Sequence, residues 1–101
     1  MFIDENGNKV NGQWAGSPEP VEHDVLTGST QEGMLLEGKT CVDWTSSEMG
    51  VIAQVGHTDG LGPNMNAMGM YASWNSSHEN GGCDNTKPRG GAGRLYCFAI
   101  E

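Results

Sequence analysis

The chain has 101 residues, which fits one domain (1–101) with a modest core. Its net charge of −8 disfavours nucleic acid as a partner, because acidic surfaces repel phosphate backbones. Sixteen glycines argue against a helical bundle, since glycine inside a helix costs about 1 kcal/mol relative to alanine. No apolar run approaches the roughly 20 residues of a membrane span, so we expect no membrane insertion.

Short apolar segments between turn signals predict a β-rich module. Near the start of the chain, Asn6-Gly7 lies between the apolar-containing pairs 2–3 and 9–10 and predicts a hairpin. Residues 21–26 contain two valines and end at Thr27-Gly28, so we expect a strand there.

The clearest internal strand is predicted at 50–56, where glycines bound an apolar run. Just before it, residues 45–49 are expected to form a helical turn. Residues 94–100 are apolar on both faces, which is typical of a strand in the middle of a sheet covered on both sides. Between these two strands, residues 56–82 have little regular pattern, and a long irregular segment in a compact domain is usually functional.

The three cysteines favour a disulfide over a metal site or a catalytic thiol. No Cys-x-x-Cys pair of the kind typical of zinc sites is present. A catalytic thiol needs a histidine partner and an electropositive setting, whereas Cys97 lies in an apolar segment and only Lys39 is near Cys41. A disulfide implies an extracytoplasmic setting, and the odd count leaves one thiol over.

The sequence contains no recognisable enzyme motif. Gly-x-Ser-x-Gly, His-Glu-x-x-His and a spaced carboxylate pair in a known context are all absent. We therefore expect a protein that is not an enzyme and that holds neither a cofactor nor a metal.

The order of cysteines, tryptophans and glycines resembles the C-type-lectin-like fold, and most closely its endostatin-like branch with bacterial relatives. The motifs are the Cys-x-x-Trp at 41–44, the Trp-Asn at 74–75, Gly82-Cys83 and the closing segment 94–101. The similarity spans nearly the whole chain, although the family domain begins earlier, with helices and a first cysteine. The resemblance implies an α+β fold, mostly β, with long irregular loops and little helix, forming the C-terminal part of a longer secreted or fibre protein.

The resemblance also implies a disulfide pairing. In the lectin-like fold the second and third of four cysteines pair, which joins Cys41 to Cys83 here. Cys97 would then lack its upstream partner, and we expect it to be a buried free thiol.

Ligands of lectin-like domains bind at the long loop, which corresponds to residues 56–82. Calcium-dependent members carry Glu-Pro-Asn and Trp-Asn-Asp there, whereas this chain has Gly62-Pro63-Asn64 and Trp74-Asn75-Ser76. Two acidic ligands are thus replaced, and although Asp59, Glu79 and Asp84 could substitute for them in a calcium site, we expect calcium-independent binding. The resulting candidate ligand-binding residues are Asn64, Trp74, Asn75, His78, His57 and Asp59.

Plainer interpretations of these residues stay open. A hydrogen-bonded loop histidine would account for His57, and Trp44 and Trp74 would be structural if they pack beside the disulfide. Met65, Met68 and Met70 would suit a contact between protomers.

These observations predict a secreted or surface-displayed recognition and adhesion module of the kind carried at a bacterial fibre tip. It would bind glycans or other cell-surface ligands and form a homo-oligomer, with a trimer favoured by analogy. The alternative is a structural protein–protein interaction or oligomerisation domain that binds no sugar. A third interpretation is a metal-dependent hydrolase using His57, Asp59 and His78.

Overall fold

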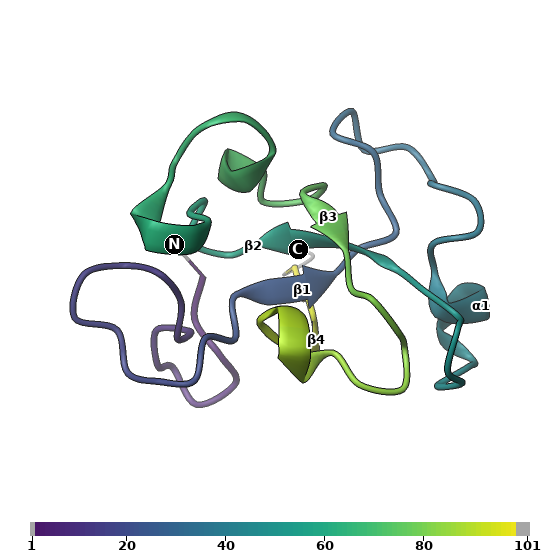
Figure 1. Cartoon of the computed structure of the whole chain (residues 1–101), viewed down its shortest axis with the longest axis horizontal. Coiled ribbons are helices and arrows are strands. Elements are labelled where there is room, and N and C mark those ends of the chain that lie inside the picture. The colour runs from purple at the N-terminus through teal and green to yellow at the C-terminus, as the bar shows by residue number, and fades with distance from the viewer. Residues whose placement is uncertain (1, 99–101) are drawn as a thin grey trace.

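A computed structural model describes residues 2–98 of the chain and places one mixed four-stranded sheet at its centre (Figure 1). The strands are β1 (Asp24–Leu26), β2 (Gln54–His57), β3 (His78–Glu79) and β4 (Gly91–Leu95). Their order is β3-β2-β1-β4. β2 runs antiparallel to both β1 and β3, while β4 runs parallel to β1. The mostly-β class with little helix is therefore confirmed.

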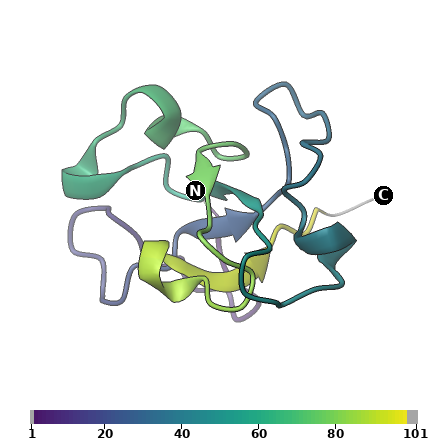
Figure 2. The same cartoon turned by 45° about the vertical axis from the view of Figure 1, so that its right-hand side comes forward.

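Four short helical turns lie in the loops that leave the sheet (Figures 1 and 2). They are α1 (Cys41–Trp44), η1 (Pro63–Met65), η2 (Gly69–Ala72) and η3 (Lys87–Arg89). Among the described residues, no helix is long and apolar enough to cross a membrane.

α1 is a left-handed turn, because its four residues have φ values between 51° and 64°. L-residues adopt this region at a cost, so the surroundings must hold the turn in place. The Thr40 hydroxyl accepts a hydrogen bond from the Asp43 N–H, and the Cys41 N–H donates to the Ile52 carbonyl. The prediction of a helical turn at 45–49 is wrong, because the turn lies in α1, which ends directly before that range.

The hairpin predicted near the start is present as a tight turn. Ile3 pairs with Lys9 in an antiparallel bridge, and the Asp4 carboxylate accepts hydrogen bonds from the N–H groups of Asn6 and Asn8. β1 lies within the predicted strand 21–26, whereas β2 begins four residues later than the predicted strand 50–56 and extends one residue past it.

The last strand occupies an edge of the sheet and not its middle, so that prediction is wrong. β4 pairs only with β1, and Leu95 and Phe98 are 55 % and 63 % exposed. The physical reason is that no further strand among the described residues covers the open side of β4. Residues 99 and 100 of the predicted strand lie outside the described residues.

Few apolar side chains are buried in the described part of the chain. They are Val10, Val25, Cys41, Ala53 and Val55. A core this small gives the disulfide a large share of the stability, because small domains bury little apolar surface.

The Cys41–Cys83 disulfide is present, as the resemblance implies, and it joins α1 to the loop after β3. Cys97 is free, as predicted, but it is exposed and not buried. It follows the edge strand β4, where the chain leaves the sheet, so nothing described packs over it.

Candidate functional site

All three histidines of the chain meet one buried carboxylate at one end of the sheet. Asp24 begins β1 and pairs in register with His57 at the end of β2. Residues directly opposite in an antiparallel pair point to the same face, so these two side chains meet. His78 comes from β3, and His23 directly precedes β1. The side chains of Asp24 and His57 are each only 2 % exposed.

Each histidine ring is oriented by a hydrogen-bond acceptor at its Nδ1 atom. The His23 Nδ1 atom lies 2.8 Å from the Asp59 carboxylate. The His57 and His78 Nδ1 atoms lie 3.1 Å and 2.8 Å from the backbone carbonyls of Tyr71 and Glu79. A carbonyl only accepts, as does an ionised carboxylate, so each Nδ1 carries the proton. In the neutral ring the lone pair is then on Nε2.

The Nε2 atoms converge on Asp24. The His57 Nε2 atom lies 3.1 Å from Asp24 Oδ1 and 3.0 Å from the His78 Nε2 atom. The His78 Nε2 atom lies 3.4 Å from Oδ2, and the His23 Nε2 atom lies 3.5 Å from Oδ1. Despite these short distances, neither carboxylate oxygen receives an aligned hydrogen bond.

The electrostatics of the cluster keep Asp24 ionised. Burial raises the pKa of this carboxyl group, but the contacts with His57 and His78 in their protonated form outweigh burial, so the pKa lies below the usual value. The contact with Asp24 raises the pKa of His78, although burial opposes this. Burial likewise raises the pKa of Asp59, but the hydrogen bonds from His23 and from two backbone N–H groups outweigh it and lower that pKa.

Two aromatic rings lie nearly parallel to the His57 ring. The His23 ring stacks on it with centroids 4.1 Å apart, and the Tyr71 ring lies parallel to it at 6.3 Å. An open pocket of about 500 Å³ reaches the three histidines from solvent, and Tyr71, Lys87 and Arg89 also line it. Imidazole and carboxylate groups in this arrangement are the ligands that transition metals use in proteins.

A second open pocket, of about 460 Å³, is lined by aromatic side chains (the aromatic pocket). Its rings are those of Trp44, Trp74, Tyr96 and Phe98. Trp44 and Trp74 are 43 % and 46 % exposed, so neither ring is buried against the disulfide. The Tyr96 hydroxyl donates to the Trp74 carbonyl at 2.8 Å, which ties the backbone at Trp74 to the segment after β4.

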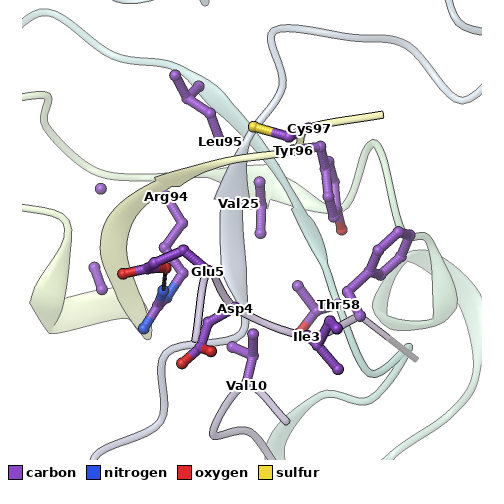
Figure 3. Close-up of a pocket in the computed structure, with 13 residues that line it drawn as sticks. Ile3, Asp4, Glu5, Val10, Val25, Thr58, Arg94, Leu95, Tyr96 and Cys97 are labelled. Atoms are coloured by element: carbon purple, nitrogen blue, oxygen red, sulfur yellow. Dashed lines mark ion pairs between the residues drawn. The ribbon is translucent and has the colours of Figure 1, made fainter. Parts of the chain in front are cut away.

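A third pocket, of about 550 Å³, lies between the N-terminal segment and β4 (Figure 3). Ile3, Val10 and Val25 give it an apolar floor, and the Arg94–Glu5 ion pair of 3.6 Å lies at its edge. It contains no cluster of convergent polar groups, and we assign it no chemistry.

The structure divides the predicted site residues between these places. His57 and His78 belong to the histidine cluster. Asp59 supports that cluster through its contact with His23. The N–H groups of Gln13 and Leu61 donate hydrogen bonds to its carboxylate and hold it in place. The remaining three candidates lie elsewhere.

Trp74 and Asn75 line the aromatic pocket, while Asn64 is exposed in η1 and lines neither of these pockets. The Asn75 amide donates to the carbonyls of Thr30 and Gln31, so it holds two loops together.

Sequence reasoning did not single out Asp24, and it gave His23 no role. Their signal in the sequence is weak, because they are adjacent to each other but 33 or more residues from the other members. The only hint of a shared site was composition, because the chain has just three histidines and all three belong to the cluster. No protein-family model, curated protein or solved structure matches this chain.

Proposed function

We propose that the protein is a recognition module that acts outside the cytoplasm and binds glycans or other cell-surface ligands in the aromatic pocket. The observation that carries this proposal is that two half-exposed indole rings, Trp44 and Trp74, line one open pocket. Exposed aromatic groups gathered in a concave surface are typical of binding sites, because binding releases water from apolar surface.

The pocket is organised before a ligand arrives. The Trp74 ring lies edge-on to Tyr96 at 5.5 Å and to Phe98 at 6.1 Å. Rings that are already packed lose little freedom on binding, so more of the contact energy remains as affinity. The apolar face of a sugar ring would stack on an indole held in this way.

Polar groups at the edge of the pocket would contact ligand hydroxyls. Thr27 and Ser29 each donate their hydroxyl hydrogen to a backbone carbonyl, and their oxygen atoms remain able to accept. Asn75 already uses its amide within the fold, so its part in binding would be to position the loop under Trp74.

The lectin-like resemblance and the extracellular or cell-surface setting are part of the same proposal. The Cys41–Cys83 disulfide is the pairing that the resemblance implies, and disulfides persist mainly in oxidising compartments.

A glycan array probed with the purified chain, with and without calcium, tests the proposal. Binding should be independent of calcium, and Trp74→Ala and Trp44→Ala should each weaken it at least 10-fold, as expected for an aromatic anchor. Trp14→Ala is the matched control, because Trp14 lies outside the pocket and is covered by Lys9. Full binding by both pocket variants, or an equal loss in the control, would contradict the assignment.

The alternative, a protein interaction or oligomerisation domain, is favoured by a different observation. Met65, Met68 and Met70 are 55 %, 76 % and 53 % exposed along one loop. Methionine is common on adaptable binding surfaces. This alternative predicts a homo-oligomer, with a trimer favoured, and light scattering that gave a monomer at micromolar concentration would count against it.

A further inference from the structure

We infer that His23, Asp24, His57 and His78 form a transition-metal site, with zinc as the preferred ion. This inference does not depend on the proposed recognition function, because it concerns a different pocket and rests on different residues. Four observations carry it, and they concern distances, lone pairs, an unpaired buried carboxylate and the orientation of the rings.

Four of the distances between the ligand atoms are close to those around a tetrahedral ion. Zinc binds imidazole nitrogen and carboxylate oxygen at about 2.0–2.2 Å, so neighbouring ligand atoms of a tetrahedron lie about 3.3–3.6 Å apart. The four distances that connect the Nε2 atoms and the Asp24 oxygens are 3.0, 3.1, 3.4 and 3.5 Å. Small adjustments of the rings would therefore allow the atoms to share one ion.

The lone pairs in the cluster need a positive charge between them. With Nδ1 protonated in every ring, the Nε2 lone pairs of His57 and His78 face each other at 3.0 Å. All three Nε2 atoms also face the Asp24 carboxylate. The Ser77 hydroxyl also lies near the His57 Nε2 atom, at 3.4 Å. Either extra protons on the rings or a metal ion would remove this repulsion.

Asp24 supplies an independent indication of a ligand. Its side chain is 2 % exposed, and neither oxygen has a hydrogen-bond partner. A buried carboxylate without partners is strongly destabilising unless a cation compensates it. A metal ion coordinated by the carboxylate would do so.

The rings are oriented as metal ligands are. Ligating histidines almost always donate their second ring N–H to a carboxylate, a backbone carbonyl or water. Here all three do, with Asp59 as the carboxylate for His23 and backbone carbonyls for the other two.

The four ligands are not equally prepared. One ligand atom each from His23, Asp24 and His57 lies within 4.8 Å of the other two, and the His78 Nε2 atom lies 3.0 Å from the His57 Nε2 atom and 3.4 Å from Asp24 Oδ2. His23 stacks parallel to His57, with 12° between the ring planes, so its ring must tilt to direct Nε2 at an ion shared with His57. We therefore assign Asp24 and His57 as the central ligands, with His23 and His78 completing the set.

The ligand set also selects the ion. Three imidazoles and one carboxylate suit zinc and its neighbours in the first transition row, whereas calcium prefers six to eight oxygens. The pocket beside Tyr71 gives the ion a path from solvent, since His78 is 24 % exposed. A bound ion would link β1, β2 and β3 at one end of the sheet.

Metal titration of the untagged chain tests the inference. The protein is stripped with a chelator, dialysed, and titrated with zinc in competition with a chromophoric chelator. We expect one zinc ion per chain and a higher melting temperature with zinc but not with calcium. Cobalt should give the intense visible bands of a tetrahedral site. No bound zinc, or a weak six-coordinate cobalt spectrum, would overturn the inference in favour of a cluster of protonated rings.

Variants identify the ligands. Asp24→Asn and His78→Gln should each weaken zinc binding about 100-fold or more and abolish the tetrahedral cobalt bands. Asp84→Asn is the control for the lost charge, because Asp84 is exposed, and it should bind as the original chain does. His78 is partly exposed, so His78→Gln keeps the test decisive if Asp24→Asn fails to fold. Unchanged zinc affinity in folded His78→Gln would overturn the assignment.

Discussion

Removal of the Cys41–Cys83 disulfide should lower the free energy of unfolding by about 4 kcal/mol. The two cysteines are separated by 42 residues in the sequence. In the chain-entropy estimate, an open loop of this length adds about 13 cal/mol/K to the entropy of the unfolded chain, or about 4 kcal/mol at 25 °C. Small domains have a total stability of about 5–15 kcal/mol, so this loss is a large fraction of it.

The structure makes the loss hard to compensate. The described core contains few apolar side chains, and the left-handed turn α1 begins at Cys41 itself. Without the disulfide, the turn would lose the covalent link to Cys83 that helps to hold its unfavourable φ values. We therefore expect α1 and the preceding loop to open first.

The assay is urea unfolding followed by tryptophan fluorescence. Cys41→Ala/Cys83→Ala is compared with the unchanged pair, both in a Cys97→Ser background that prevents thiol exchange. Substitution is preferable to a thiol reductant, because thiols also bind zinc. Cys97→Ser alone should change stability by less than about 0.5 kcal/mol, as exposed sites usually do. A loss below about 1 kcal/mol in the double variant would refute the argument.

Three further predictions concern single residues. Gly56→Ala should destabilise the fold by about 3 kcal/mol or more in the same urea assay, because a Cβ there would lie 1.8 Å from the Trp74 carbonyl oxygen; a loss under 1 kcal/mol would contradict the close approach. Cys97 is exposed, so Ellman's reagent should titrate one thiol per native chain, and a thiol that reacts only in denaturant would contradict this. Burial raises the pKa of Tyr96, and the negative charges of Asp59 and Asp24 add to this. The stability that comes from this shift should be present below about pH 10, the usual phenol pKa, and be lost as pH rises through the raised value. Absorbance at 295 nm in Tyr71→Phe should therefore titrate above pH 10, and a midpoint at or below 10 would contradict it.

Composition and local patterns determined the outline of this protein. Glycine content and short apolar segments indicated a mostly-β module, and Asn6-Gly7 marked the first turn correctly. These features depend on the conformational preferences of a few neighbouring residues, so they can be read without the rest of the chain. The order of cysteines added the Cys41–Cys83 pairing through the family resemblance.

Tertiary structure alone decided which strand lies at the edge and which side chains meet. The apolar pattern of residues 94–98 is compatible with either a middle or an edge strand, and only the pairing of β4 with β1 places it at the edge. Likewise, Trp44 and Trp74 share a pocket only because the fold brings their two loops together.

The histidine cluster shows most clearly which features could not be predicted from the sequence. His57 and His78 were candidates from the sequence, grouped with Asp59 in one interpretation, but Asp24 was not among them. Their meeting depends on the register that sets Asp24 opposite His57 and on the pairing of β3 with β2. Strand register is set by contacts between segments far apart in the sequence, so no local spacing encodes it.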